Sequence, residues 1–432
     1  MFHSKLSPKG QKRWRFPLDI DCLRVNVLGV GTLVVVCIVT TLICQQFITA
    51  SDPVGFSQYS VGRSIQSLLQ FDDREKQQNI SQDIKAQIKN ALKIQRRLIN
   101  GEMDGYLYPR GRYNVSASKL SDLVPELGGT PVRSIILTTW RSGSTFLGDI
   151  LDSHPGNFYH YEPLLQYEIV QIRGPPLWHE ARHLVRSLTM CNYTTLTNYL
   201  QYGMEHNYLF THNSRLWEMC AQFPDLCFEP EFLNSFCRLF PFQSMKIVRV
   251  RLKLFQDLLD DPRLNLRVLL LIRDPRGILQ SRKHRVWCPG NPDCTEPSRL
   301  CADMVSDYSA AIKFSKKYKN RFKVMRYEDI SLDPYSSVSE LFSFFGLDLH
   351  PNVIEFLDTH TKVNIGGVSS TYRDSKAAPF HWRNDLAFEE VTQIQASCKS
   401  ALRLWGYKTA VNATHQRNFI PISKEFRLGK AS

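Results

Sequence analysis

The chain has 432 residues, of which 43% are hydrophobic and 22% are charged, and this composition excludes a chain too polar to bury a core. The length allows one large domain with accessory segments. Lysine and arginine number 54 against 41 acidic residues, so the formal net charge is +13. Such a charge suits anionic partners, whether nucleotides, nucleic acid, anionic lipid or acidic glycans, and does not choose among them.

The N-terminal region contains an uncharged apolar stretch, residues 25–44, about as long as a helix that crosses a ~30 Å hydrocarbon core. Basic residues precede this stretch and none follows it until Arg63, so the positive-inside rule places residues 1–24 in the cytosol and the rest of the chain in a lumen. We interpret 25–44 as a transmembrane signal anchor. The alternative, a cleaved signal peptide, has an apolar core of only about 7–15 residues.

Two further features indicate a secretory compartment. Four Asn-x-Ser/Thr sequons follow the predicted anchor, at Asn79, Asn114, Asn192 and Asn412. Eight of the eleven cysteines also lie beyond the anchor, and this even number is compatible with disulfides in an oxidising lumen. Three of these cysteines crowd the segment 288–301, and with His284 beside them a zinc site remains an alternative, although no Cys-x-x-Cys pair is present.

Residues 45–130 are predicted to form a luminal stem, with a helical pattern from Glu75 to Ile99. Four apolar residues in it are near heptad spacing, at Ile84, Ile88, Ala91 and Leu98. A stem helix that forms a homodimer would use this spacing. Only about two heptads are present, however, so a helix packed on the main domain, or a solvated spacer, remains an alternative.

From Val132 onward, short β-branched runs alternate with helical segments, which is typical of a parallel sheet with crossover helices. The predicted strands are 134–139, 158–161, 246–251, 267–272 and 322–326. The predicted helices are 145–153, 277–285, 303–319, 335–345 and 388–404. We therefore expect an α/β domain over 131–410 and a C-terminal tail over 411–432. The segment 171–243 has no clean period and carries four cysteines, so we interpret it as an insertion in this domain.

One short motif, Trp-Arg-Ser-Gly-Ser-Thr at 140–145, follows a predicted strand and opens a helix. Backbone N–H groups and the helix dipole stabilise an anion at such a junction. Gly143 lets the backbone approach closely, while Ser144 and Thr145 add hydroxyl donors. Arg141 adds a permanent charge with five N–H donors. The motif alone is weak, because a Ser/Gly turn before a helix is often only an N-cap.

A second junction strengthens this interpretation. The apolar run 266–272 ends in Arg273-Asp274-Pro275-Arg276, and Ser281 and Arg282 follow in the next predicted helix. Asp274 as a helix cap and Pro275 at the first helical position would explain part of this segment without a ligand. Because α/β sheets bind ligands at the carboxyl ends of their strands, the two junctions together predict one site that holds two phosphate groups of a nucleotide.

Two absences narrow the chemistry. The sequence has no G-x-x-x-x-G-K-[ST] motif, so an ATP-hydrolysing phosphate loop is not supported. The residues beyond the predicted anchor also have no Asp-x-Asp pair, which commonly holds the divalent ion of membrane-anchored glycosyltransferases. A reaction that needs no metal is therefore favoured, and a glycosyltransferase stays as the main alternative.

With these motifs, the segment from about Val132 to Tyr407 resembles the Golgi carbohydrate sulfotransferases that act on the 6-hydroxyl of N-acetylglucosamine, galactose or N-acetylgalactosamine. Residues 138–146 resemble the 5′-phosphosulfate loop of that family, and residues 273–282 resemble its 3′-phosphate segment. Further similar segments are Tyr161-Glu162-Pro163, Arg326 to Asp329, Trp382-Arg383 and Trp405 to Tyr407. After Pro163 the chain lacks the Trp-His that members commonly have, so the acceptor sugar stays open.

The resemblance implies a P-loop-like fold without a metal, 3′-phosphoadenosine 5′-phosphosulfate as the donor, and a glycan on a glycoprotein or proteoglycan, rather than nucleic acid, as the acceptor. The expected donor-binding residues are Arg141, Ser142, Gly143, Ser144, Thr145, Arg273, Ser281 and Arg282. Arg373 and Arg383 join them as residues of a loop whose composition suits a flap over a nucleotide. Arg141 would also be catalytic, because it would stabilise charge on the leaving oxygen. The insertion 171–243 would help to form the acceptor site.

Glu162 is the candidate base for the sugar hydroxyl, because the family pattern supplies it and because burial can raise the pKa of a carboxyl toward working pH. His160 is the alternative, since side chains two residues apart in a strand share a face and an imidazole titrates near neutral pH. Trp140 would pack beneath the adenine or fill the core. The sequence thus predicts a single-pass type II Golgi membrane enzyme, with a catalytically inactive glycan-binding relative as a second alternative.

Overall fold

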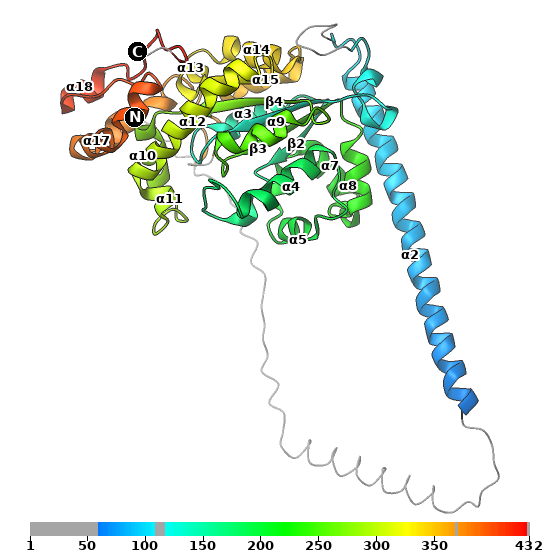
Figure 1. Cartoon of the computed structure of the whole chain (residues 1–432). Helices are drawn as coiled ribbons and strands as arrows, with labels where there is room; N and C mark the ends of the chain where they lie inside the picture. Colours follow the sequence, from blue (N-terminus) through cyan, green and yellow to red (C-terminus); the bar gives the residue numbers. More distant parts are fainter. Residues whose placement is uncertain (1–58, 109–116, 368–369, 430–432) are drawn as a thin grey trace, which may run out of the picture. The chain divides into compact units, whose positions relative to one another are not determined.

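The structure is a computed structural model that describes residues 59–108, 117–367 and 370–429 (Figure 1). The chain divides into two compact units, Met1–Lys76 and Gln77–Ser432, and the predicted α/β domain belongs to the second. The predicted anchor, residues 25–44, lies outside the described residues. No helix within the described ranges is both long and apolar enough to span a membrane.

Five parallel strands form one sheet in the order β2-β3-β1-β4-β5. Their bounds are Val132–Leu137 (β1), Asn157–Tyr161 (β2), Phe242–Ile247 (β3), Leu266–Ile272 (β4) and Phe322–Arg326 (β5). Every residue of β1, β3 and β4 is buried, as expected of central strands that are covered on both faces. The predicted parallel sheet is therefore confirmed, and β1 lies between β3 and β4.

The predicted position of β3 is wrong by four residues, since the strand spans Phe242–Ile247 and not 246–251. The prediction was based on apolar runs, and the polar residues Gln243 and Ser244 near the start of β3 interrupt such a run. Gln243 accepts a hydrogen bond from Arg133 Nε (3.0 Å), and the hydroxyl of Ser244 accepts one from Asn157 Nδ2 (2.7 Å). Both polar side chains are thereby satisfied inside the core, which removes the cost of burying them.

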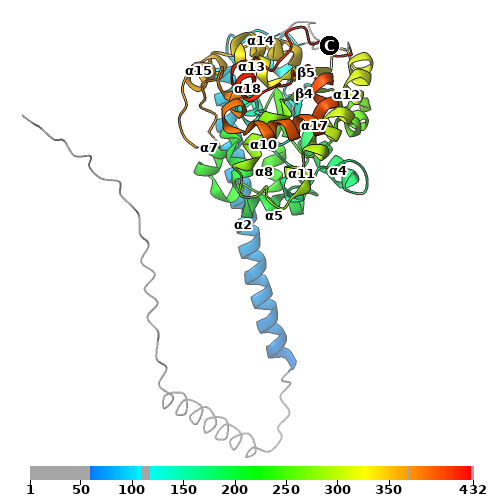
Figure 2. The same ribbon diagram turned by 90° about the vertical axis from the view of Figure 1, so that its left-hand side faces the viewer.

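Helices flank the sheet: α13 to α15 lie on one side of it and α4 to α8 on the opposite side in both views (Figures 1 and 2). The α-helices are α2 (Tyr59–Glu102), α3 (Ser144–Asp152), α4 (Leu177–Thr189), α5 (Thr197–Glu205), α6 (Tyr208–Thr211), α7 (Ser214–Gln222), α8 (Pro230–Cys237), α9 (Gln256–Asp260), α10 (Pro275–Lys283), α11 (Pro292–Thr295), α12 (Pro297–Lys317), α13 (Tyr327–Leu332), α14 (Pro334–Phe345), α15 (Pro351–His360), α16 (Trp382–Asp385), α17 (Phe388–Leu404) and α18 (Ala413–Asn418). The insertion 171–243 is thus helical and supplies α4 to α8.

The described side chains of α2 belong to the second unit and pack within it. Ile88, Ala91 and Ile99 are buried in its core, and Arg96 pairs with Glu126 at 2.7 Å. Of the four residues at near-heptad spacing, Ile88 and Ala91 are thus explained by packing in the main domain, which was the alternative to a dimeric stem, whereas Leu98 is 41% exposed.

The predicted disulfides are present. The four pairs are Cys191–Cys237, Cys220–Cys227, Cys288–Cys294 and Cys301–Cys398. All three cysteines of the segment 288–301 are therefore oxidised. A zinc site there is wrong, because thiolates are the ligands that it would need.

Candidate active site

The junction between β1 and α3 is a tight turn whose backbone has two left-handed residues, Arg141 (φ 68°) and Gly143 (φ 85°). A Cβ atom on Gly143 would lie 2.3 Å from the ring of Tyr327, so a glycine is needed for space as well as for its φ angle. The helix begins at Ser144, and the first N–H groups of a helix have no partner within it. The turn therefore directs the first N–H groups of α3, and also the Arg141 side chain, toward the carboxyl edge of the sheet.

The junction between β4 and α10 lies against this turn. Arg141 Nε donates to the hydroxyl of Ser281 (3.0 Å), and Arg273 Nη1 donates to the carbonyl of Arg141 (2.7 Å). Asp274 caps α10, because its carboxylate accepts a hydrogen bond from the backbone N–H of Arg276. The same carboxylate also pairs with the buried guanidinium of Arg276 at 2.7 Å. The two junctions thus meet because their strands are neighbours in the sheet.

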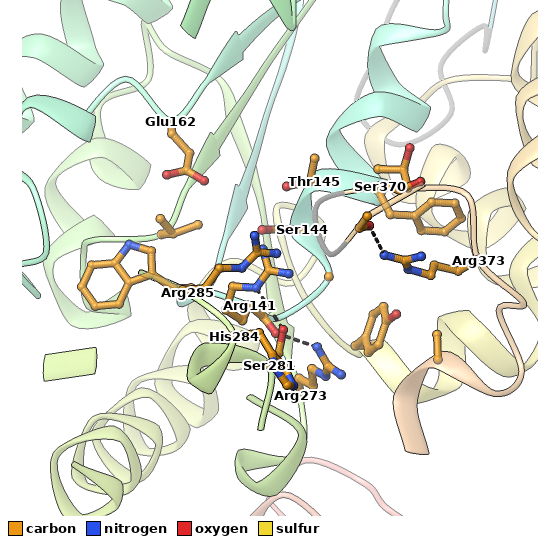
Figure 3. Close-up of a pocket in the computed structure, with 18 of the residues that line it drawn as sticks. Arg141, Ser144, Thr145, Glu162, Arg273, Ser281, His284, Arg285, Ser370 and Arg373 are labelled. Atoms are coloured by element: carbon orange, nitrogen blue, oxygen red, sulfur yellow. Dashed lines mark hydrogen bonds between the residues drawn. The ribbon is translucent and has the colours of Figure 1, made fainter. Parts of the chain in front are cut away.

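A cavity of about 1350 Å³ opens where the junctions meet (Figure 3). Eight of the predicted site residues line it: Arg141, Gly143, Ser144, Thr145, Glu162, Arg273, Ser281 and Arg373. Arg141 and Ser144 lie in the middle of the view, with Glu162 on one side and Arg273, Ser281 and Arg373 on the other. The remaining three predicted residues do not line the cavity.

Arg282 is one of these three, and it is buried beneath the turn between β1 and α3. Its guanidinium donates to the carbonyl of Trp140, to the hydroxyl of Thr139 and to the carbonyl of Cys294. Burial lowers the pKa of Arg282 to about 9. The geometry gives this arginine a supporting position in which its donors hold the loop from below.

Ser142 and Arg383 also lie away from the cavity wall. The side chain of Ser142 is buried within the turn. Arg383 donates to the carbonyl of Phe419 at 2.7 Å and is thereby directed toward the C-terminal segment. Arg373, by contrast, lines the cavity, and its guanidinium donates to the carbonyl of Gly367 at 2.6 Å.

Glu162 is largely buried and is held by two cations. Its carboxylate oxygens lie 2.8 Å from Lys246 Nζ and 2.9 Å from Arg249 Nη1. Burial alone would raise the pKa of the Glu162 carboxyl, but the two cations outweigh it and lower that pKa to about 2. The expectation that burial raises this pKa toward neutrality is therefore wrong.

His160 faces away from the cavity. It is buried, its Nε2 lies 2.7 Å from the hydroxyl of Tyr193, and burial lowers its pKa to about 4. The expected shared face with Glu162 is not formed, because β2 ends at Tyr161 and Glu162 has a positive φ of 38°. Strand alternation does not continue through such a turn, so Tyr161 and Glu162 both line the cavity and His160 does not.

Two residues near the site escaped the sequence analysis. Lys246 is fully buried at the end of β3, and its ammonium lies 3.1 Å from Thr145 Oγ1 and 3.8 Å from the centre of the Tyr161 ring. Arg249, two residues beyond the same strand, lines the cavity. The available signal was a lysine within an otherwise buried strand next to β1. The ion pair with Glu162 compensates the charge of this buried lysine, and that pair is visible only in the structure.

Trp140 lines the cavity and is also packed in the protein. Its ring is 4% exposed, lies 6.4 Å from Trp287 in an edge contact, and has the guanidinium groups of Arg249 and Arg282 over it at 5.6 and 5.5 Å. These contacts agree with the packing role among the two that the sequence left open.

A parallel sheet with arginine-bearing and serine-bearing junctions at the carboxyl ends of two adjacent strands defines the class of nucleotide-dependent α/β enzymes. Within this class, residues 131–406 match the family model described as the sulfotransferase domain. The chain belongs to the sulfotransferase domain family. The family implies 3′-phosphoadenosine 5′-phosphosulfate as the sulfuryl donor, and its match tells against the glycosyltransferase alternative.

Similar curated proteins refine this assignment. Carbohydrate sulfotransferase 5 of Mus musculus is 28% identical over 335 residues, which are 67% of this chain and 84% of that protein. Carbohydrate sulfotransferase 1 of Mus musculus is 30% identical over 335 residues, which are 66% of this chain and 81% of that protein. The predicted resemblance to the carbohydrate sulfotransferases is confirmed, and with it the prediction of a carbohydrate sulfotransferase enzyme.

Among solved structures, retinol dehydratase in complex with androsterone and inactive cofactor PAP is similar at 16% identity and a TM-score of 0.35. The match covers 63% of this chain and 81% of that chain.

Proposed function

We propose that the chain transfers a sulfuryl group from 3′-phosphoadenosine 5′-phosphosulfate to the 6-hydroxyl of an N-acetylglucosamine, galactose or N-acetylgalactosamine residue. The acceptor would be a glycan on a glycoprotein or proteoglycan. The observation that carries this proposal is the contact between the two junctions, in which Arg141 bonds to Ser281 and Arg273 bonds to the Arg141 carbonyl. One ligand with two anionic ends would contact both junctions at once.

The residues on the cavity wall fit such a donor. The phosphosulfate end would lie at the start of α3, where Ser144 and Thr145 offer N–H and hydroxyl donors beside Arg141. The 3′-phosphate end would lie at Arg273 and Ser281, with Arg373 approaching from the segment between α15 and α16. Several guanidinium groups that face one cavity favour a ligand with several negative charges.

The reaction would then proceed by in-line transfer. The sugar hydroxyl oxygen forms a bond to sulfur, the bond from sulfur to the bridging phosphate oxygen breaks, and the hydroxyl proton passes to Glu162. Arg141 and the N–H groups at the start of α3 would stabilise the charge that develops on the leaving bisphosphate. Most of the catalysis would come from this positioning and charge stabilisation.

Lys246 connects the two halves of this mechanism. Its ammonium contacts both Thr145, where the sulfuryl end would lie, and Glu162. An anion at Thr145 would compete with Glu162 for Lys246. A carboxylate that loses one of its two cations has a higher pKa, and this makes Glu162 a better proton acceptor when the donor is bound.

We further propose that the enzyme is a single-pass type II protein of the Golgi membrane, with residues 25–44 as its anchor. The uncharged stretch with its basic flank supports the topology, and four disulfides among the described residues support an oxidising lumen. The Golgi assignment rests on the family resemblance. A stem dimer through α2 stays a prediction.

The first experiment gives the purified chain the radiolabelled donor and acceptors that end in galactose, N-acetylglucosamine or N-acetylgalactosamine. We expect label on one acceptor class and its loss in Arg141→Ala and Glu162→Gln. Binding of adenosine 3′,5′-bisphosphate without any labelled acceptor would favour a catalytically inactive relative. A chain that does not bind the bisphosphate at all would contradict the proposed function.

A further inference from the structure

The part of the cavity around Glu162 has a different composition from the part around Arg273 and Arg373. Arg273 and Arg373 line the latter part, and Arg141 and Arg285 lie between it and Glu162 (Figure 3). The former part is lined by aromatic rings of the insertion 171–243. These rings are Tyr202 on α5, Tyr208 on α6 and His212 between α6 and α7, and we call them the aromatic wall.

The aromatic wall is fixed to the end of β2. The ring of His212 stacks on that of Tyr161 at 3.7 Å, and its Nδ1 lies 3.5 Å from Asp149 Oδ1. The next residue, Asn213, caps α7 and donates from its amide to the carbonyl of Tyr159 at 3.1 Å. The wall is therefore held next to the strand end that carries Glu162.

The two tyrosines of the wall keep part of their surface open. Tyr208 is 45% exposed, and Tyr202 is half-buried and stacks on His206 at 4.0 Å. Burial, Tyr202 and Glu162 together raise the pKa of Tyr208 to about 12, so its hydroxyl stays protonated and can donate a hydrogen bond. A large ring that is left open on a cavity wall contributes little to the core and offers a flat apolar face to a ligand.

Charge is balanced around the aromatic wall. Lys246 and Arg249 are both paired with Glu162, and Glu168 adds a second carboxylate to the cavity lining. Lys246 is fully buried behind the cavity lining, so Arg249 alone of these two cations faces this part of the cavity, together with the two carboxylates. A carboxylate-bearing ligand would gain no net attraction here, in contrast to the arginine-lined part.

We propose that the aromatic wall is the binding site for the reacting sugar of the acceptor, and that this sugar is an uncharged hexopyranose rather than a uronic acid. A pyranose ring presents an apolar C–H face that packs on aromatic rings, while its hydroxyls bond to tyrosine hydroxyls and to His212. The sugar would bind with its hydroxymethyl group toward Glu162. This inference rests on the proposed function and adds the residues that bind and select the acceptor sugar.

The test compares Tyr202→Ala and Tyr208→Ala with Tyr208→Phe, which keeps the ring, and with Tyr335→Ala. Tyr335 is a partly exposed tyrosine on α14 that lies outside the cavity lining and bonds to Asp358. For the disaccharide that the enzyme sulfates, we expect each alanine variant of the wall to raise the acceptor KM about 10-fold. Tyr208→Phe keeps the ring but loses the hydroxyl, so it should raise the acceptor KM less than Tyr208→Ala does. Tyr335→Ala should keep the acceptor KM near that of the unaltered chain. The Kd for adenosine 3′,5′-bisphosphate should be the same in all variants.

A second measurement addresses the sugar directly. Saturation-transfer NMR on the chain with bound bisphosphate should detect ring C–H contacts for a β-galactoside or N-acetylhexosaminide and none for the matched β-glucuronide. An unchanged acceptor KM in both alanine variants, or equal contacts for the glucuronide, would overturn the aromatic wall as the acceptor site. Binding of the bisphosphate without contacts to any of the sugars would do the same. Failure to bind the bisphosphate would instead reject the proposed function.

Discussion

Glu162 is a carboxylate whose chemistry is set by its neighbours rather than by its burial. Lys246 and Arg249 each approach one of its oxygens to within 3 Å and hold its pKa near 2. The residue is thus ionised at any physiological pH, but a carboxylate with so low a pKa is a weak proton acceptor. Its basicity depends on how tightly these two cations hold it when the donor is present.

Replacing Glu162 by Gln removes the proposed proton acceptor and keeps the side-chain volume. We expect kcat to fall by about 10²–10⁴ and the Kd for adenosine 3′,5′-bisphosphate to stay nearly unchanged. Glu340→Gln is a suitable control, because Glu340 is an exposed carboxylate on α14 that forms a surface ion pair with Lys323 and lies outside the cavity lining. A Glu162→Gln variant with normal turnover would reject Glu162 as the base.

The pH profile provides an independent check on Glu162. Since its pKa in the free enzyme lies near 2, below the ordinary value of 4.5, the carboxylate stays charged as pH falls through the neutral range. The profile of kcat/KM reports groups of the free enzyme, so we expect no acid limb from Glu162 between about pH 5 and 8. An acid limb in this pH range that Glu162→Gln abolishes would contradict the lowered pKa of Glu162.

Gly143 and Gly290 form a matched pair for testing the turn. Both have φ near +82° to +85°, but a Cβ on Gly143 meets the Tyr327 ring at 2.3 Å, whereas one on Gly290 meets nothing within 4 Å. Each alanine variant should lose roughly 1–2 kcal/mol of unfolding free energy from backbone strain. Only Gly143→Ala should also weaken bisphosphate binding, by about 10-fold or more. If the two variants had equal effects on urea unfolding and on the Kd for the bisphosphate, the contact between residue 143 and Tyr327 would not affect ligand binding.

At the scale of elements, the site exists because β1 and β4 are neighbours, so the residues that follow each strand meet at one edge of the sheet. The helix α10 then presents Ser281 to Arg141, while Arg282 holds the loop from beneath. Helix α17 packs on α10 and α12, and the disulfide Cys301–Cys398 joins α12 to α17. This crosslink thus supports the helix layer that packs on α10.

The disulfides should differ in what they contribute to stability. Cys301–Cys398 closes a loop with a sequence separation of 97, whereas Cys288–Cys294 closes one with a separation of 6. In the chain-entropy model the long loop is worth about 4–5 kcal/mol and the short one about 2 kcal/mol. Double serine variants compared by thermal unfolding should therefore show the larger fall in Tm for Cys301 and Cys398. A larger fall for the short loop would contradict this account.

At the scale of the whole molecule, residues 77–432 form one compact unit that contains the entire cavity lining. The part of α2 in this unit is not a separate spacer, because Ile88, Ala91 and Ile99 are buried in the core. Each buried isoleucine contributes roughly 1.5–3 kcal/mol. The catalytic unit therefore includes part of the region that we predicted as stem.

Two truncations test this boundary. A chain of residues 77–432 should bind adenosine 3′,5′-bisphosphate as tightly as the full chain and unfold at a similar Tm. A chain of residues 104–432 lacks the buried face of α2, so we expect a clearly lower Tm or aggregation. Equal stability of the two truncated chains would show that α2 is dispensable to the fold.

Much of this arrangement could be predicted from the sequence, because it depends on local patterns. The apolar run 266–272 is a strand buried on both faces, and it appears as β4 with the predicted bounds extended by at most one residue. The glycine and hydroxyl residues at 143–145 signal a strand-to-helix turn, and the structure has that turn. Helix α12 begins at Pro297 rather than at 303, because a proline is favoured in the first helical turn and does not end a helix there.

The sequence by itself determined the parallel α/β class, the two junctions and the family, since each rests on residues that are close together in the chain. Tertiary structure alone decided which charged residues face the cavity. Arg282 and Arg141 look alike in sequence, but one is buried under the loop and the other lines the cavity. Lys246 is 84 residues from Glu162, and only the pairing of β2 with β3 brings them to 2.8 Å. Electrostatic interactions act through space, so the pKa of Glu162 is a property of the folded chain and not of its local sequence.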